Sequence, residues 1–451
     1  MLPSVSARGA ALTPLDREAP DSNDVAAIES EGLESEGHDA WNEAGGRGIG
    51  DAIQTFKLPY YARLWSSNLI QFICFQVLFL AMQWLVTSLT PLRSAVGLVG
   101  FIQGGTIALA SPAAGVLVDR EAKRNLIGFG RLGLAGVAMI IGLLAWTDTI
   151  SFWHLLVVSI IGGLLSSVLS PATQTFVVDV VGRHRTHHAI SLNAVGSSFG
   201  TMGGGALGGF LIGTIGVVGA FVSASVGVLL AAIVVISIPI VGRAMPTADS
   251  VRSSALAELR EGFAYVRARP PLLLALLACS MAIFNGAISP MRIFFARDVL
   301  SVGPEGLGAM AGVHGIGTFA ASLLAIVRPP QRHLGLVIAG TMLAYAVGLV
   351  LYSFAFSFAW VLVVELWLGL TGMLWNIAAL IGFQLAVPEE MRGRVLSMVF
   401  TLAQLGFVGI LAVGALADLV GDQTALLIFG SIPTLLLSGL MLFGWKTLRQ
   451  M

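Results

Sequence analysis

The sequence reads Gly115-Val-Leu-Val-Asp119-Arg120-Glu-Ala122-Lys123-Arg124 at the junction of two long apolar segments. No charged residue precedes this run back to Arg93, and only Arg131 follows it before Asp148. A cluster of charge between two apolar segments of membrane-spanning length is typical of a short loop on one side of a bilayer. The simplest interpretation is a solvated turn whose cations fix the orientation of the chain.

Composition indicates an integral membrane protein. The 451 residues are 56% hydrophobic and only 11% charged, and the mean hydropathy is +0.86, whereas soluble proteins carry about 25% charged residues. The apolar runs are about 20 residues long, as helices require, rather than the ten or so alternating residues of a barrel strand. The formal net charge is zero, so no nucleic-acid partner is expected. Two cysteines, Cys74 and Cys279, both in apolar segments, exclude a disulfide framework.

Residues 1–56 differ from the rest of the chain. They hold 11 of the 25 acidic residues and lack the apolar segment of a secretory signal. Low hydrophobicity with net negative charge predicts a disordered acidic tail on the cytoplasmic side. A regulatory or partner-binding role for this tail is an open alternative.

The apolar pattern predicts an all-α membrane protein of twelve transmembrane helices. The predicted spans are 64–89, 95–118, 125–147, 153–178, 188–214, 217–241, 271–297, 305–327, 334–354, 358–386, 393–417 and 424–445. An even number of spans places both termini on the same side. With the N-terminus inside, 21 of the 25 Lys and Arg residues fall in inner segments. This asymmetry predicts cytoplasmic termini in the inner or plasma membrane. Arg131 lies one or two turns inside the third span, and we expect it to snorkel.

The spans divide into two six-helix bundles, 57–242 and 271–451, joined by a cytoplasmic linker at 243–270. Within the linker, apolar residues at helical spacing predict an amphipathic helix on the inner leaflet; they are Leu256, Leu259, Phe263 and Val266. A shift of 206 residues superposes Ser191 on Ser397 and Gly203 on Gly409. This weak repeat predicts pseudo-symmetric halves of parallel topology.

The charged run at 115–124 resembles the loop between helices 2 and 3 of the major facilitator superfamily, Gly-x-Leu-x-Asp-Arg-x-Gly-Arg-Lys. The matching residues are Gly115, Leu117, Asp119, Arg120, Lys123 and Arg124, and Ala122 stands where the family has glycine. The resemblance implies a gate rather than a substrate site. Asp119 at a helix end, with arginines nearby, can form a charge-assisted clasp that forms and breaks as two bundles rock.

The fifth span carries glycines at four-residue spacing, which predicts close helix packing. It also resembles the family's antiporter motif through Gly200, Gly204, Gly208 and Gly209, with Gly205 in place of proline. That motif implies an exporter. The arginine that proton-driven drug antiporters carry in helix 4 has no counterpart in 153–178.

A second charged loop, at 388–395, contains Glu390, Arg392 and Arg394. Together with its counterpart at 179–185, it resembles the branch of facilitators that includes siderophore (enterobactin) exporters and multidrug efflux proteins. The resemblance covers about 60–446 and leaves the substrate open.

Polar side chains inside the spans are candidates for the substrate cavity. Four amides of the first span fall within about 140° of one another on a helical wheel; they are Asn68, Gln71, Gln76 and Gln83. Such a face either lines a cavity or packs on another helix. In the tenth span, Trp367, Trp375 and Asn376 are candidates for a further wall, although packing or interface anchoring explains the tryptophans equally well.

Glu365 is the acidic residue well inside a predicted span, and an intramembrane ionisable group is a functional candidate. We hypothesise that Glu365 titrates during transport with His314 or Arg292 as its partner. The alternative is a structural pair that holds helices 7 and 10 together.

These features predict a secondary active transporter that exports a small amphipathic molecule, drug-like or a siderophore, by alternating access with proton coupling. We expect a monomer in the bilayer. A nutrient importer, a lipid flippase and a membrane scaffold are the alternatives. No Gly-x-x-x-x-Gly-Lys-Ser/Thr loop occurs, which excludes a primary pump in this chain. No nucleophile–base pair or metal-ligand spacing is found, so we expect no enzyme activity, cofactor or metal. We expect His184, His187 and His188 to lie in a solvated loop.

Overall fold

The computed structural model describes residues 55–58, 60–182, 186–242, 255–328 and 332–451, and the folded unit runs from Thr55 to Met451. Most of the predicted acidic tail therefore lies outside the described residues. Thr55 and Phe56 belong to the folded unit instead, and the ring of Phe56 packs edge-on against Trp65 at 5.1 Å between centroids.

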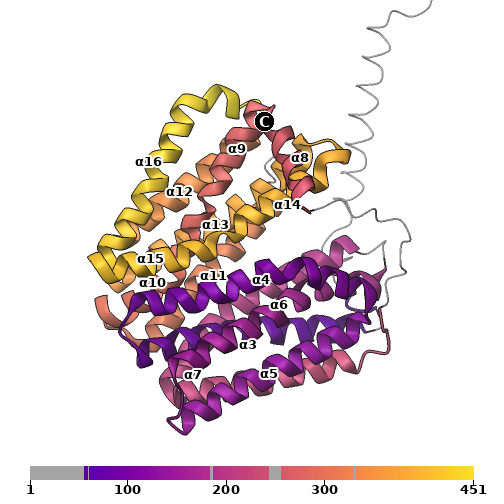
Figure 1. Cartoon of the computed structure of the whole chain (residues 1–451), viewed down its shortest axis with the longest axis vertical. Helices are drawn as coiled ribbons and strands as arrows, with labels where there is room; N and C mark the ends of the chain where they lie inside the picture. The colour runs from indigo at the N-terminus through magenta and orange to yellow at the C-terminus, as the bar shows by residue number, and fades with distance from the viewer. Residues whose placement is uncertain (1–54, 59, 183–185, 243–254, 329–331) are drawn as a thin grey trace, which may run out of the picture. The chain divides into compact units, whose positions relative to one another are not determined.

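Every regular element in this part of the chain is helical (Figure 1). The first half contains α3 (Tyr61–Leu89), α4 (Arg93–Arg120), α5 (Lys123–Trp146), α6 (Phe152–Val181) and α7 (Thr186–Ile236). The second half contains α8 (Ala255–Arg267), α9 (Pro270–Ser280), η2 (Met281–Ala287), α10 (Ile288–Phe294), η3 (Phe295–Val299), α11 (Gly303–Val327), α12 (Leu334–Phe354), α13 (Phe358–Ala386), α14 (Glu389–Gln404), α15 (Gly406–Val420) and α16 (Asp422–Leu448).

Eleven helical stretches of the described residues are long and apolar enough to span a membrane, and the longest holds two crossings. That stretch, His188–Ile236, has 49 residues, or about 74 Å of helix against a hydrocarbon core of about 30 Å. Its backbone breaks at Gly216, where φ is 74°, a conformation that glycine adopts readily.

Contacts with α3 show that the chain reverses direction at this break. Before Gly216, glycines 200 and 208 face positions 72 and 77, so the two segments run parallel. After it, the carbonyl of Ala231 accepts a hydrogen bond from Ser67 while Gly227 faces Cys74, so the segments run antiparallel. The twelve predicted crossings are therefore present.

The described helices form two groups, which Figure 1 shows in indigo to magenta and in orange to yellow. In the first half α7 packs on α3 and α5, and α4 packs on α6. In the second half α13 packs on α11 and α12, and α16 packs on α12. Among the described residues, the most extensive contacts between the halves are those of α4 with α15 and of α7 with α11.

Glycine allows the close approach of both pairs. A Cβ atom added to Gly104 of α4 would lie 2.5 Å from the Cβ of Phe407, and one added to Gly209 of α7 would lie 2.5 Å from the Cα of Gly308. Real Cβ contacts are not this short, so neither position has room for a larger residue without a shift of its neighbour.

The seventh and eleventh crossings are both interrupted where they meet. The seventh changes from α-helix to the 3₁₀ segment η2, and the eleventh breaks at Leu405 between α14 and α15. At this point a Cβ on Gly286 would lie 2.0 Å from the carbonyl oxygen of Gly406. The interruptions therefore lie at a direct backbone contact between the two crossings.

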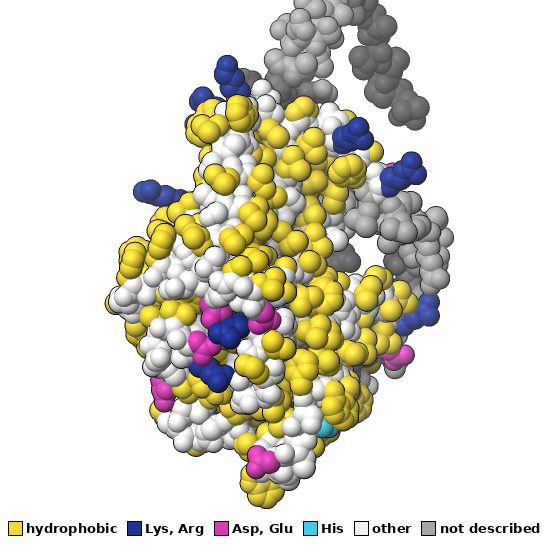
Figure 2. All heavy atoms as spheres, turned by 60° about the vertical axis from the view of Figure 1, so that its left-hand side comes forward, with side chains coloured by type: hydrophobic (Ala, Val, Ile, Leu, Met, Phe, Trp, Pro, Cys, Tyr) yellow, Lys and Arg dark blue, Asp and Glu magenta, His cyan; other side chains and the backbone are white. Residues whose placement is uncertain are grey.

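On the face that Figure 2 shows, hydrophobic side chains are spread widely and charged side chains gather in a few places. Leu109 and Phe443, for example, are 86% and 94% exposed. Large apolar side chains on the outside and paired backbone groups within helices are what a hydrocarbon environment requires. The described chain is therefore a multi-pass membrane protein.

Candidate functional site

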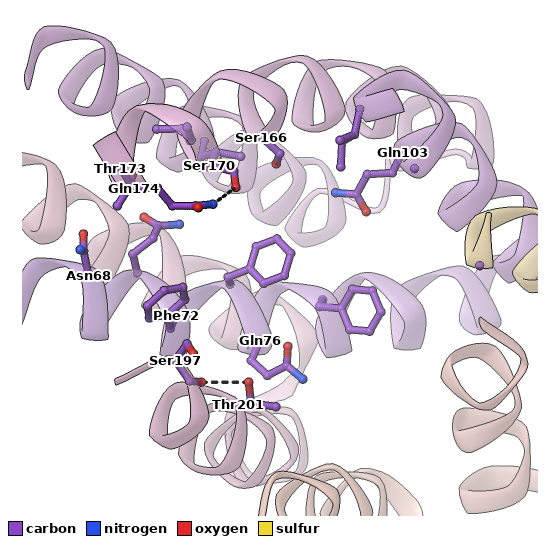
Figure 3. Close-up of a pocket in the computed structure, with 18 of the residues that line it drawn as sticks. Asn68, Phe72, Gln76, Gln103, Ser166, Ser170, Thr173, Gln174, Ser197 and Thr201 are labelled. Carbon is purple, nitrogen blue, oxygen red and sulfur yellow. Dashed lines mark hydrogen bonds between the residues drawn. The ribbon is translucent and has the colours of Figure 1, made fainter. Parts of the chain in front are cut away.

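A cavity of about 980 Å³ lies between the two halves. Its lining comes from α3, α4, α5, α6 and α7 in the first half, and from η2 and α15 in the second. Figure 3 shows Gln103, Ser166, Ser170, Thr173 and Gln174 along one wall, facing Asn68, Phe72 and Gln76 across the space. Gln71, predicted from the same helix face as Asn68 and Gln76, also lines the cavity.

The lining combines amides with aromatic rings. The Asn68 side chain donates a hydrogen bond to Asn193 at 3.2 Å, whereas the side-chain oxygens of Gln71 and Asn285 are buried without a partner. Buried amide oxygens without partners are available to a bound molecule. The phenyl rings of the lining supply apolar surface beside them; they are Phe72, Phe75, Phe79 and Phe407.

A second, smaller pocket of about 100 Å³ continues from the cavity. It shares Phe75, Phe79 and Gln103 with the cavity and extends along apolar side chains to Val86. Gln83, the fourth predicted amide, borders this pocket and donates a hydrogen bond to Ser289 of the other half at 3.0 Å. The amide face of α3 therefore both lines the cavity and bonds another helix.

Arg131 does not snorkel, contrary to expectation: its side chain lies inside the first half and is 1% exposed. Its guanidinium donates hydrogen bonds to Ser67 and Asn68 of α3, and its Nε is buried without a partner. Polar acceptors on the neighbouring helix hold the side chain inward. Arg131 is also part of the cavity lining.

Charged contacts join the two halves at the end of the molecule that carries Arg93. The guanidinium of Arg93 donates to both carboxylate oxygens of Asp422, each at 3.1 Å, and to Asp298 at 3.1 Å. The carboxylate of Asp418 accepts from the backbone nitrogens of Arg93 and Ser94, at 2.6 and 2.9 Å. Ionic hydrogen bonds of this kind are among the stronger contacts in proteins, so this end is closed.

The opposite end, which carries Lys123, lacks such bridges: between described residues, no hydrogen bond or ion pair joins the halves there. Lys123 pairs with Asp179 at 2.8 Å, within the first half. Arg124 donates to the carbonyl of Ile238, also in the first half. Ile190 of the cavity lining is 54% exposed, and the cavity reaches this end.

The predicted gating motif lies at this end. A Cβ on Gly115 would meet no atom within 4 Å, so α4 has no close neighbour at this position. Asp119 and Arg120 are exposed, and neither contacts an opposite charge among the described residues. Of the motif's charged side chains, Lys123 and Arg124 have the polar contacts given above.

The second charged loop contacts the linker helix. Arg394 pairs with Glu261 of α8 at 2.8 Å, Glu390 is exposed, and Arg392 is half-buried. The predicted linker helix is present as α8, and it packs on α14. Of its predicted apolar face, Val266 is buried and Phe263 is exposed, while the side chains of Leu256 and Leu259 lie outside the described residues.

The glycines of α7 face two different helices. Gly200, Gly204 and Gly208 face α3, whereas Gly209 faces α11 of the other half. Gly205, which replaces the proline of the family motif, also faces α11, with Ala311 as its neighbour. The row therefore serves packing both within the first half and between the halves.

Glu365 of α13 is fully buried and lies at the centre of a polar cluster in the second half. Arg292 of α10 donates two hydrogen bonds to its carboxylate, at 2.7 and 2.8 Å. Tyr352 of α12 donates a third at 3.1 Å, and the Nδ1 of His314 in α11 lies 3.0 Å from Oε2. Both predicted partners thus contact Glu365, and the cluster joins four helices.

This cluster and the cavity are separate. None of the four clustered side chains belongs to the cavity lining, and neither does Asn376, which is exposed. Trp367 donates to the carbonyl of Ala344, and Trp375 is buried in the core of the second half. The described residues include no group of three His, Cys, Asp or Glu side chains that could hold a metal ion.

Comparison with known proteins agrees with this architecture. The family model of the Major Facilitator Superfamily matches residues 64–409. The chain belongs to this superfamily. This facilitator is 23% identical over 362 residues to the uncharacterized MFS-type transporter YfiS of Bacillus subtilis (strain 168), covering 76% of this chain and 82% of that one. It is 26% identical over 194 residues to the multidrug resistance protein MdtG of Serratia proteamaculans (strain 568), covering 43% and 44%.

Solved structures share the fold of this facilitator at low sequence identity. A mutant of the nucleoside transporter NupG superposes with a TM-score of 0.72 at 12% identity, covering 85% of this chain and 99% of that one. A bacterial homolog of the human lysosomal transporter Spinster, in an inward-facing, unoccupied conformation, gives 0.67 at 15%, covering 87% and 98%. The facilitator fold and membership of a transporter family are therefore established for this chain.

Proposed function

We propose that this facilitator is a secondary active exporter of small amphipathic molecules, such as drug-like compounds or siderophores. The observation that carries the proposal is the cavity of about 980 Å³ between halves whose mutual polar contacts lie toward one end. A cavity closed at one end is what alternating access requires of one of its two states. Amides beside phenyl rings suit an amphipathic molecule, and one relative is named a multidrug resistance protein.

The sidedness of the proposal follows from the cations. In the sequence, 21 of the 25 Lys and Arg residues fall in the predicted inner segments, one of which is the loop that contains Lys123, so by the positive-inside rule the Lys123 end would be cytoplasmic. The cavity would then open to the cytoplasm, where an exporter collects its substrate. The Arg93 end would be the extracellular or periplasmic gate.

We further propose that transport is driven by protons through the cluster of Glu365. The Glu365 carboxylate bonds Arg292 through both of its oxygens and His314 through one of them. One added proton would then be held within this buried cluster, on Glu365 or on His314. Protonation would weaken the bonds among α10, α11 and α13, and so couple charge to helix packing. If the pair is structural instead, its loss lowers stability without altering coupling.

The test uses everted membrane vesicles with an imposed proton gradient, acid inside. Export in cells appears there as gradient-dependent uptake of a fluorescent lipophilic dye, of a labelled drug or of a catecholate siderophore. We expect uptake by the wild type and its collapse when the gradient is dissipated. Glu365→Gln should abolish gradient-driven uptake while leaving counterflow exchange of substrate intact.

The control is Arg328→Gln, which removes an exposed cation at the end of α11. It should transport as the wild type does. Unchanged coupling in Glu365→Gln would remove this residue from the mechanism. Accumulation by whole cells instead of vesicles would indicate an importer rather than an exporter. Movement of labelled phospholipid alone would indicate a flippase.

A further inference from the structure

We infer that Arg131 is the residue that binds the anionic group of the substrate, so that this facilitator carries amphipathic anions, with carboxylates as the simplest class. The inference rests on the proposed function and deepens it. It starts from a cation in the cavity wall that has no anionic partner. Arg131 lies eight residues beyond Lys123, which is about 12 Å inside the helix end.

The bonding of Arg131 differs from that of the buried Arg292 and Lys123 and of the half-buried Arg93. Arg292 has Glu365, Arg93 has Asp422, and Lys123 has Asp179. Arg131 is 1% exposed, yet between described residues it bonds only uncharged oxygens, those of Ser67, Asn68 and Ala231. An arginine keeps its charge inside a protein. An uncompensated buried charge is strongly unfavourable, and an anion that completes the pair binds correspondingly well.

The surroundings of Arg131 favour a ligand as the source of that anion. No Asp or Glu lies among the described residues that line the cavity, so Arg131 is the ionisable group in its wall. The Nε of Arg131 and the side-chain oxygen of Gln71 are both buried without a hydrogen-bond partner. Asn68 connects Arg131 to Asn193, and both amides belong to the lining. An entering carboxylate can replace the Asn68 oxygen on the guanidinium.

The rest of the cavity fits the apolar part of such a molecule. Phe72, Phe75 and Phe79 of α3 line the cavity, and Phe75 and Phe79 also line the smaller apolar pocket. A molecule with a carboxylate at Arg131 and a hydrocarbon or aromatic tail along these rings would use both kinds of surface. A cationic amphiphile would meet the like charge of Arg131, which the lining does not offset.

The test measures equilibrium binding of matched probes to the purified full-length protein in phosphatidylcholine nanodiscs. The probes are 11-(dansylamino)undecanoic acid and its carboxamide, which differ in charge but hardly in shape. We expect the wild type to bind the acid about tenfold to a hundredfold more tightly than the amide, as a buried charged hydrogen bond implies. Arg131→Gln should remove this preference and bind the amide as the wild type does, and Arg131→Lys should keep part of it.

Binding of the amide reports whether the variant is correctly folded, since replacing a merely structural Arg131 would weaken the binding of both probes together. Arg328→Gln is the matched loss of an exposed cation and should keep the full preference. Equal binding of acid and amide by the wild type overturns the inference without any variant, and so does a preference that survives in Arg131→Gln. Anionic phospholipid could supply the same chemistry. Nanodiscs that contain phosphatidylglycerol distinguish the source. If this lipid abolishes acid binding by the wild type but does not change acid binding by Arg131→Gln, the site belongs to lipid.

Failure of this inference and failure of the proposed function give different results. Vesicles that export dye while acid and amide bind equally refute the anion site alone. Vesicles that export none of the compounds refute the proposed exporter, while the binding measurement still decides the role of Arg131.

Discussion

Removing the Arg93 side chain should open the end of the molecule at which the two halves are bridged. Arg93 gives two charged hydrogen bonds to Asp422 and one to Asp298, with side chains 28%, 8% and 36% exposed, respectively. Charged hydrogen bonds contribute roughly 1.5–3 kcal/mol and partial exposure lowers this, so we take about 2 kcal/mol for the set. That is about a 30-fold change in the equilibrium between closed and open states. An open state at about 1% would rise to about a quarter of the molecules.

The assay is the distance between two nitroxide labels, measured by pulsed electron spin resonance. The labels replace Leu92 and Leu419, which are exposed and lie at this end in different halves, in a variant without Cys74 and Cys279. Arg93→Ala should add a population at longer distance. Arg394→Ala is the control, since its ion pair with Glu261 lies within the second half. The same distance distribution in both variants would refute the gate.

Three further substitutions test packing and charge through the thermal stability of the purified protein. Gly209→Ala should destabilise by about 1–3 kcal/mol, because its Cβ would lie 2.5 Å from the α11 backbone, whereas a Cβ on Gly203 would meet no atom within 4 Å, so Gly203→Ala should be nearly neutral; equal stability of the two would contradict the tight crossing. Glu365→Leu should cost about 3–5 kcal/mol by leaving Arg292 buried and unpaired, and the double variant with Arg292→Met should recover part of it; a further loss in the double variant would argue against the pair. Gly216→Ala should cost more than about 1 kcal/mol, because φ there is 74°; an unaltered melting temperature would mean that the turn tolerates a side chain.

The lengths of the apolar runs were sufficient to predict the spans. A hydrocarbon core accepts only segments near 20 residues long, so a 49-residue apolar stretch had to contain a turn, and it does at Gly216, between the predicted spans 188–214 and 217–241. The partners of Glu365 could be named because so few charged side chains lie within the spans. Arg292 and His314 both contact it.

Contacts that depend on how distant helices meet could not be predicted in the same way. Asp418 and Asp422 bind Arg93 across more than 320 positions of sequence, and neither their spacing nor their type names that partner. Arg131 was expected to reach toward water because its side chain is long. Ser67 and Asn68 hold it inward instead, and only the packing of α5 on its neighbours brings those acceptors near.

The amide and hydroxyl side chains of the cavity come mainly from the first half, whereas the Glu365 cluster belongs wholly to the second. Under the function proposed above, substrate recognition and proton coupling would then be encoded by separate segments of the gene. Mutations in α3, α6 or α7 would then alter the range of compounds to which a cell becomes resistant and leave proton coupling intact. Selection for a new cargo would have to change only one of the two bundles.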